Sequence, residues 1–522
     1  MKFSEMYYKR PDVEYYTQKI DKIIETINNA NSADEQLAAH KEFTNLSQNL
    51  SSMQTIAHIR NTMNTEDEFY NKENDFFDEN SPMFEKMSTD FYRALVESKY
   101  RPELEKKLGK LLFINAELQL KSFKPIIIPE LQEENKLTTE YVKLMASAQI
   151  EFDGKELNLT QLRLYQESPD RKVRIEAYKK RTEFFEENKE KLDEIFDKLV
   201  KVRTDMAKKL GYENYVELGY MRMGRNCYGP KQVSAFKEQV KKYMVPLSNR
   251  LHELQRKMLG LEKATFIDNL LYFKEGNPKP IGTPEQIFEA GKKMYDELSK
   301  ETSEFFRFML ENGLLDCLSR KGKATGGYMT YIEDYKSPFI FANFNGTSGD
   351  VDVLTHEAGH ALNSYLAKDI EISEYQSSTM ETAEVHSMSM EFFTMPWMNH
   401  FFGDRTEDYA FMHLASAINF IPYGCAVDEF QHVIYMNPEM TPQDRKNAWK
   451  QIEMEFQPHL DYEGDPFFGA GARWQAQTHI YSVPFYYIDY CLAQTCALQF
   501  RNLLTKDYQS AWEKYLDFSK KA

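Results

Sequence analysis

The pentapeptide HEAGH at residues 356–360 constrains the fold most, because its two histidines can act together only on a helix. Residues four apart share one face of an α-helix, so His356 and His360 would lie side by side with Glu357 next to them. The flanking sequence favours a helix, since residues 345–350 supply turn and capping side chains and apolar residues recur over 353–366. We therefore expect a helix that presents two imidazoles and a carboxylate to a metal ion.

A third metal ligand is needed, since an ordinary amphipathic helix can contain this pentapeptide by chance. Zinc in hydrolases takes three protein ligands and leaves one position for water. A second helical stretch at 381–391 offers four candidates: Glu381, Glu384, His386 and Glu391. Spacing alone leaves both Glu381 and Glu384 open as the third ligand.

Helical periodicity dominates the rest of the 522-residue chain. Segments rich in Glu, Lys, Leu and Met, with apolar residues three and four apart, cover 100–120, 171–210, 232–261 and 284–314. A chain of this length is too long for one small core, so we expect two or more lobes. Eight of the eleven histidines lie after residue 350. We predict an N-terminal helical scaffold or lid lobe over 1–225 and a catalytic lobe over 226–522.

Two places are typical of β-strands. Residues Ile150–Leu159 carry alternating apolar residues on both sides of Asp153-Gly154, which is a hairpin signal. Residues Gly327–Phe344 contain YMTYI and PFIFANF, separated by a turn-prone segment. The second place, directly before the histidine helix, predicts a small antiparallel sheet beside it, and Phe339–Phe344 is a candidate edge for pairing with an extended peptide.

Composition excludes several classes of protein. A net charge of −16 argues against a nucleic-acid partner, which would require a basic stripe. Five scattered cysteines give no disulfide framework and fit a reducing compartment. The N-terminus lacks the pattern of a signal peptide, and no run approaches the ~18 apolar residues of a membrane helix. We expect a cytoplasmic protein without a membrane partner.

A second group of candidate residues follows near the C-terminus: His479, Tyr486, Tyr487 and Tyr490. Tyr490 lies four residues after Tyr486 and three after Tyr487, so either pair can share a helix face. Pro484 is expected near the start of that helix, which would place the tyrosines in its first turns. An aromatic core stripe is the alternative explanation for these tyrosines.

The remaining histidines divide into two sets. His386, two residues from Glu384, could support that ligand from behind. The others are expected to be ordinary surface or core residues: His40, His58, His252, His400, His413, His432 and His459.

With these residues in place, the chain resembles the thimet oligopeptidase, neurolysin and oligoendopeptidase F family of zinc peptidases. The likeness is greatest to the bacterial oligoendopeptidase F and Pz-peptidase branch. It is carried by NFNGTSGDVDVLTHEAGHAL, AEVHSMSMEFF and HIYSVPFYYIDYCLAQ, with a weaker match at SPDRKVRIEAYKKR, and spans most of residues 150–500. One departure is the end, YLDFSKKA, which closes within an amphipathic helical pattern where family members usually continue for a few dozen residues.

The resemblance implies a mainly α, two-lobed, neurolysin-like zincin with a deep substrate channel and one zinc ion per chain. It favours Glu384 as the third ligand, because the family places another Glu seven residues later, which here is Glu391. It also implies that His479 and Tyr490 face the metal and stabilise the tetrahedral intermediate. The choice between Tyr486 and Tyr487 stays open.

The function that follows is a zinc endopeptidase for short unstructured oligopeptides, with Glu357 as the general base. A monomer or small homo-oligomer is expected. Three alternatives remain: a peptidyl-dipeptidase, a non-catalytic peptide-binding zincin, and a helical scaffold with a structural zinc. The first would need a residue that fixes the terminal carboxylate of the peptide, and the sequence identifies none. An intact Glu357 argues against the second, and the absence of a nearby Cys in the motif argues against the third.

Overall fold

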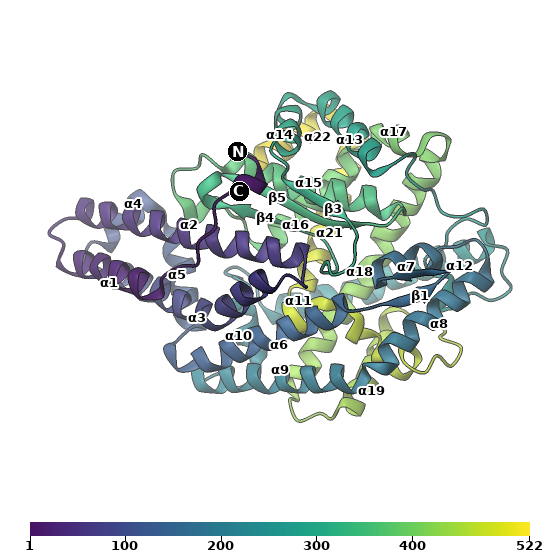
Figure 1. Cartoon of the computed structure of the whole chain (residues 1–522), viewed down its shortest axis with the longest axis horizontal. Coiled ribbons are helices and arrows are strands. Elements are labelled where there is room, and N and C mark those ends of the chain that lie inside the picture. The colour runs from purple at the N-terminus through teal and green to yellow at the C-terminus, as the bar shows by residue number, and fades with distance from the viewer. Residues whose placement is uncertain (522) are drawn as a thin grey trace.

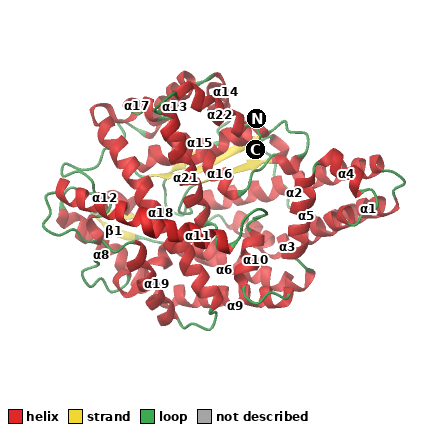
Figure 2. Cartoon of the chain, turned by 180° about the vertical axis from the view of Figure 1, so that it is seen from behind, coloured by secondary structure: helices red, strands yellow, loops and turns green. Residues whose placement is uncertain are grey.

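The computed structural model describes residues 1–521, which form a mainly helical protein with two small sheets (Figure 2). The helices before the first strand are α1 (Val13–Asn29), α2 (Ala33–Met63), α3 (Glu68–Val96), α4 (Arg101–Leu108), α5 (Lys110–Ser122) and α6 (Ile128–Ala146). The helices of the middle of the chain are α7 (Leu159–Gln166), α8 (Arg171–Glu187), α9 (Lys189–Leu210), α10 (Tyr215–Arg222), α11 (Pro230–Gln239), α12 (Val245–Met258), α13 (Pro284–Leu298) and α14 (Lys300–Glu311). The last helices are α15 (Gly349–Ala367), α16 (Met380–Phe393), α17 (Asn399–Phe402), α18 (Thr406–Met436), α19 (Pro442–Phe456), α20 (Thr478–Ser482), α21 (Tyr487–Leu504) and α22 (Tyr508–Ser519).

The four segments predicted to be helical are helical, with short breaks at residues that favour them. Helices α4 and α5 separate at Gly109, where φ is +82° and a Cβ would lie 2.5 Å from the Tyr375 hydroxyl. Helices α13 and α14 separate at Ser299, whose side chain caps α14 by accepting from the Thr302 N–H. A five-residue π-helix, Val240–Met244, joins α11 to α12 without a break.

Two large hydrophobic cores hold the protein together, and each combines segments that are distant in sequence. The core segments are 3–113, 272–415 and 511–516 for the first core and 123–266 and 421–491 for the second. In Figure 1, the purple helices α1, α2, α4 and α5 project to one side of the sheet, and α6, α9 and α19 lie on the opposite side of the molecule from α13 and α14. Each core draws on residues from both sides of residue 225. The division into a scaffold or lid lobe over 1–225 and a catalytic lobe over 226–522 stays a prediction.

The larger sheet is mixed, which corrects the expectation of a purely antiparallel one. Strand β5 (Ser337–Phe344) pairs antiparallel with β4 (Tyr328–Ile332) and parallel with β3 (Leu315–Leu318), in the order β3-β5-β4. Strand β5 is therefore central, and the prediction that Phe339–Phe344 forms a free edge is wrong. The reason is visible in its burial, since seven of its eight residues are buried, as in a strand covered on both faces. Strand β4, which is largely half-buried, is an edge.

The predicted hairpin is confirmed. Strands β1 (Ile150–Phe152) and β2 (Lys155–Leu157) pair antiparallel, with Ile150 opposite Leu157. Asp153 and Gly154 form the turn with φ of 52° and 70°, the left-handed geometry of a two-residue hairpin loop. The strands stop at Leu157, because Asn158 caps α7 and begins a helix there.

Helices α15 and α16 pack so closely that only glycine fits between them. A Cβ on Gly359 would lie 2.6 Å from the Ser387 Cα and 2.7 Å from the His386 carbonyl oxygen. Both neighbours are backbone atoms, which cannot move aside as a flexible side chain could. Gly359 therefore sets how near α16 lies to the HEAGH face of α15.

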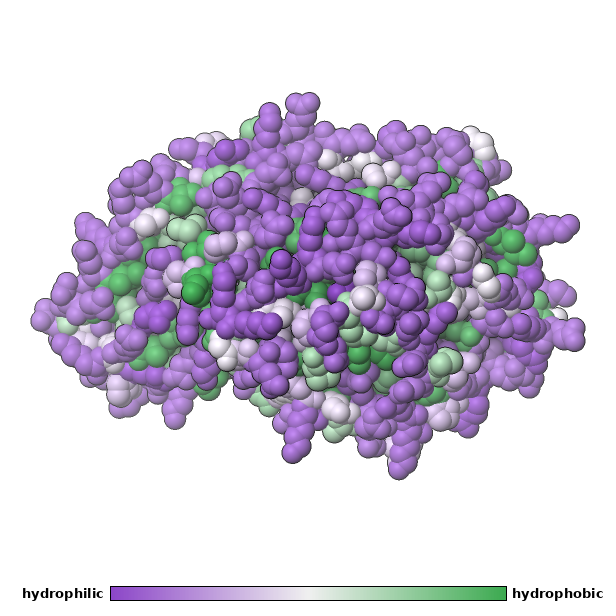
Figure 3. Space-filling model, turned by 90° about the horizontal axis from the view of Figure 1, so that it is seen from below, coloured by the Kyte–Doolittle hydropathy of each residue, from purple (hydrophilic) through white to green (hydrophobic). Residues whose placement is uncertain are grey.

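The face of the molecule shown in Figure 3 is mostly hydrophilic, and hydrophobic residues are scattered among the hydrophilic ones. One helical stretch, Asn399–Met436, is long and apolar enough to cross a membrane by length and composition alone. This corrects the expectation that no segment reaches that composition. Of the most apolar 18-residue window in this stretch, 56% is buried inside the protein, as in a core helix. A single such stretch is therefore weak evidence for a membrane span.

We expect Gly359→Ala to lower the free energy of unfolding by about 1–3 kcal/mol, because the added methyl group meets backbone on α16. Chemical denaturation measures this loss. The control is Gly229→Ala, since Gly229 has an ordinary φ and its nearest neighbour to a new Cβ is 3.9 Å away. Equal stability of the Gly359→Ala protein and the wild type would show that the two helices can separate at no cost.

Candidate active site

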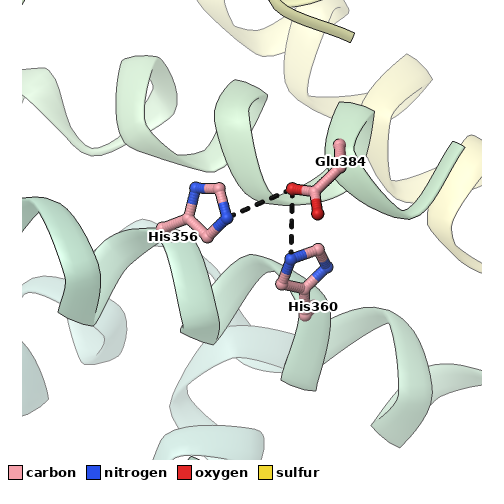
Figure 4. Close-up of side chains that lie close together, drawn as sticks. All are labelled: His356, His360 and Glu384. Carbon is pink, nitrogen blue, oxygen red and sulfur yellow. Dashed lines mark ion pairs between the residues drawn. The ribbon is translucent and has the colours of Figure 1, made fainter. Parts of the chain in front are cut away.

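Three side chains from two helices meet at one point (Figure 4). His356 and His360 project from α15, and their Nε2 atoms lie 3.2 and 3.4 Å from one Oε2 of Glu384 on α16. One ligand atom from each of the three residues lies within 4.8 Å of the other two. The structure thus brings together the three residues predicted as metal ligands.

Glu384 and Glu381 occupy different environments on α16. Glu384 is 1% exposed and belongs to this cluster. Glu381 lies one turn earlier and accepts a hydrogen bond of 2.8 Å from the Thr379 hydroxyl at the start of the helix. Of the two carboxylates that spacing left open, only Glu384 reaches the histidines.

His356 is held from behind by a carboxylate. Its Nδ1 donates to Glu391 Oε1 at 2.8 Å, and the Nε2 of His413 on α18 lies 2.7 Å from the other oxygen of Glu391. Burial opposes the charge on Glu391, but the bonds from the two histidines outweigh it and lower its pKa to about 2. With its proton on Nδ1, His356 keeps the Nε2 lone pair free for a metal.

Glu384 is also held in place. Its Oε1 accepts a short hydrogen bond from the Tyr486 hydroxyl, and its Oε2 accepts one of 2.9 Å from Ser387 Oγ. Burial would raise the pKa of Glu384, but His360 and His356 outweigh it and hold that pKa well below its usual range. The carboxylate is therefore charged and fixed in orientation.

Glu357 differs from Glu384 and Glu391 in that one of its carboxylate oxygens has no hydrogen-bond partner among the described residues. It is 5% exposed, and within residues 1–521 its buried Oε2 has no hydrogen-bond partner. Burial raises the pKa of Glu357 above its ordinary value, although His356 and His360 pull it down. A buried carboxylate oxygen without a partner is costly, so this atom is placed for a ligand that the protein itself does not supply.

The donor set fits zinc. Two neutral imidazole nitrogens and one carboxylate oxygen are a ligand set that zinc takes in hydrolases, where it retains a position for water. The unpartnered oxygen of Glu357 lies next to that set and could accept a hydrogen bond from such a water. The residues present therefore suit a catalytic rather than a closed structural site.

His479 and Tyr490 contact each other, and both rings lie beside that of Tyr486, which bonds to Glu384. The Nε2 of His479 is 3.2 Å from the Tyr490 hydroxyl, and its Nδ1 accepts from the Gln477 amide at 2.8 Å. Gln477 in turn accepts 2.9 Å from the Tyr423 hydroxyl, which fixes its amide orientation and places the His479 proton on Nε2. Burial lowers the pKa of His479 to about 4, so the ring is neutral near pH 7.

Tyr486 and Tyr487 differ in what they contact. The Tyr486 hydroxyl reaches Glu384, whereas the Tyr487 ring packs against Phe420 and Tyr423. Helix α21 begins at Tyr487, three residues after Pro484, so the expected helix start is slightly early. Of the two neighbouring tyrosines, Tyr486 is therefore the one that contacts the candidate metal ligands.

The histidines divide differently from the sequence expectation. His386 does not support Glu384: its Nδ1 lies 3.1 Å from Ser519 Oγ, and its carbonyl accepts from Tyr515, so it anchors α22. His413, expected to be an ordinary residue, takes the supporting role through Glu391. Nothing in the sequence near His413 signals this, because the contact joins α18 to α16. Gln477 was also missed, since a glutamine two residues before a histidine carries no pattern.

A cavity of about 320 Å³ lies between the N-terminal helices and the loop that joins α20 to α21. It is lined by His58 and Thr62 of α2, by Ser482 at the end of α20, and by Val483 and Pro484 of that loop. Thr62 Oγ1 is 2.6 Å from the hydroxyl of Tyr328 on the edge strand β4. The cavity therefore adjoins both the sheet edge and the segment that carries Tyr486.

Two family matches cover most of the chain. Residues 164–279 and 285–517 match peptidase family M3, and residues 3–123 match a peptidase M3 N-terminal domain. The candidate site, from α15 to α21, lies inside the first of these matches.

Known proteins with similar sequences and structures agree with these matches. The chain is 51% identical to a solved Pz peptidase A with an inhibitor, with a TM-score of 0.99, covering 100% of this chain and 93% of that one. It is 22% identical to the oligopeptidase PepF of Bacillus subtilis over 94% of this chain and 76% of the relative. It is 23% identical to an oligoendopeptidase F homolog of Borreliella burgdorferi over 74% of this chain and 68% of the relative.

Proposed function

Because the chain belongs to peptidase family M3 and is therefore a metallopeptidase, we propose that it is a zinc endopeptidase for short, unstructured oligopeptides. The observation that carries the proposal is the group of His356, His360 and Glu384 beside the unpartnered carboxylate of Glu357. These three residues would hold one zinc ion per chain. Zinc, when bound, polarises the scissile carbonyl and acidifies a water molecule.

Glu357 acts as the general base and then the general acid. Its free oxygen accepts the proton of the attacking water, and the raised pKa of the buried carboxyl suits a group that must hold a proton briefly. It then passes that proton to the nitrogen of the departing amine. A binding protein without catalysis would have no use for this carboxylate.

Tyr490 and His479 stabilise the negative charge that develops on the carbonyl oxygen. Burial, with the charge of Glu384 adding to it, raises the pKa of Tyr490 well above its ordinary value, so its hydroxyl remains a donor. The Nε2–H of His479 is the second donor, held in that tautomer by Gln477. Tyr486, bonded to Glu384, positions that ligand, and its ring lies 5.0 Å from the ring of Tyr490.

The edge strand β4 is the place where an extended peptide would pair. Strand β4 starts next to Gly327, where a Cβ would lie 3.5 Å from Glu357 Oε1. Backbone pairing along this edge would bring a peptide bond to the base.

A cytoplasmic location, and a monomeric or small homo-oligomeric state, complete the proposal. Release of C-terminal dipeptides is the alternative activity.

We expect Glu357→Gln to lose about 10²–10⁴-fold in kcat while it keeps its metal, because only the proton acceptor is removed. Turnover of a quenched fluorescent peptide and metal analysis measure the two effects. The matched control is Glu371→Gln, an exposed glutamate that follows α15. Turnover at the wild-type rate in Glu357→Gln would rule out Glu357 as the base.

Glu384→Gln should empty the metal site, and Glu381→Gln should leave it full. Only the carboxylate of Glu384 lies with the two histidines, whereas Glu381 bonds to Thr379. Metal content after dialysis, followed by turnover, separates the two variants. Loss of the metal in Glu381→Gln alone would show that the third ligand is misassigned.

Tyr490→Phe should lower kcat about 10²–10³-fold with little change in KM, since the lost hydroxyl acts on charge absent from the ground state. His479→Ala should show a similar but smaller loss. In Tyr490→Phe, zinc content and Tm should stay near wild type, because the aromatic ring of residue 490 and its packing remain. Tyr487→Phe is the control, as that ring packs against Phe420 and Tyr423. If Tyr490→Phe turns over normally, the tyrosine belongs to the core and the donor lies elsewhere.

A further inference from the structure

Arg181 lies on the inner face of α8 without a counter-ion. Its neighbours on that face, Ala177, Tyr178, Thr182 and Phe185, are all buried, and Arg181 itself is half-buried. Its guanidinium lies over the rings of Phe468 and Phe185, at 5.1 and 5.7 Å from their centroids. Throughout residues 1–521, no carboxylate forms an ion pair with it and no oxygen accepts a hydrogen bond from it.

Two neighbouring arginines are neutralised, which leaves Arg181 as the uncompensated charge of the three. Arg163 pairs with Glu167 at 3.1 Å, and Arg473 pairs with Glu453 at 2.9 Å. Burial lowers the pKa of Arg181, and the charges of Arg473 and Arg163 lower it further. The half-buried guanidinium therefore keeps its N–H donors and one positive charge available for an anion.

A chain of contacts connects this arginine cluster to the active site. The Arg473 guanidinium lies 4.6 Å from the centroid of the Tyr423 ring. Tyr423 donates to Gln477 at 2.9 Å, and Gln477 donates to His479 at 2.8 Å. The Phe468 ring below Arg181 lies 5.4 Å from the Phe266 ring, and the Arg473 guanidinium lies 5.9 Å from the centroid of Phe266. Arg181 therefore lies at one end of a series of contacts that leads to His479, and α18 carries both Tyr423 and His413.

We propose that Arg181 binds a carboxylate of the peptide substrate and so helps to set which peptides are cleaved. The proposal rests on the proposed peptidase function and names a determinant of its specificity. A guanidinium presents paired N–H groups that match the two oxygens of a carboxylate, which a lysine cannot do. The carboxylate is either the C-terminal α-carboxylate or the side chain of an Asp or Glu near the cleaved bond.

Three peptides of one core sequence distinguish these sources: a free C-terminal acid, the C-terminal amide, and an amide whose last residue is Asp. In the wild type we expect the free acid to be preferred over the plain amide. In Arg181→Gln, kcat/KM for the free acid should fall about 10- to 100-fold, mainly through KM, and the preference should approach one. Arg181→Lys should restore part of it.

Lys180→Gln is the matched control. It removes the same charge from the next residue of α8, where the side chain is 41% exposed and pairs with Glu183. This variant should keep the wild-type preference. Tm and metal content of Arg181→Gln show whether the variant is folded and loaded.

Peptide binding to the Glu357→Gln protein, followed by fluorescence anisotropy, tests the inference without catalysis. It separates failure of the carboxylate site from failure of the peptidase function. Recovery of binding by the Asp-terminated amide assigns the side-chain carboxylate, and its absence assigns the α-carboxylate. An unchanged preference for the free acid in Arg181→Gln, or an equal loss on all three peptides, would overturn the proposal.

Discussion

The close approach of α15 and α16 is the constraint on which the site depends. Gly359, between the two histidines, allows the backbone of α16 to lie against α15 at Ser387 and His386. That contact places Glu384 where one of its oxygens reaches both imidazoles. A larger residue would push α16 outward, because backbone atoms block its side chain. The glycine thus matters as much to the geometry as the ligands on each side of it.

Next to this contact, the carboxylates that reach His356 and His360 are held by hydrogen bonds from other side chains. Glu391 accepts from His356 and contacts His413, and Glu384 accepts from Tyr486 and Ser387. Groups bound this way lose their freedom, which fixes the ligand geometry. By contrast, Glu357 has an oxygen with no partner among the described residues, and Arg181 has no anion. In the proposed function, water or substrate supplies these two missing partners.

Much of the fold could be predicted from the sequence, because it depends on local chemistry. Asp153-Gly154 specifies a two-residue hairpin turn wherever it occurs between alternating apolar residues. The helical segments follow from periodicity, and their breaks fall at residues such as Gly109 and Ser299 that favour them. The two histidines of HEAGH needed only a helix to share a face. The assignment of Glu384 as the third ligand needed more than helix geometry. Spacing alone also allowed Glu381, and only the family resemblance favoured Glu384.

The sequence by itself determined the helices, the hairpin and the pair of histidines, since each requires only contacts between residues close together in the chain, at most seven apart in the hairpin. Tertiary structure decided the rest. It made β5 a central strand, placed His413 rather than His386 behind the candidate metal ligands, and placed Tyr486 rather than Tyr487 against Glu384. It also built each core from both sides of residue 225. The physical reason is that periodicity shows which face of an element is buried, but the partner on that face is fixed only when distant elements pack together.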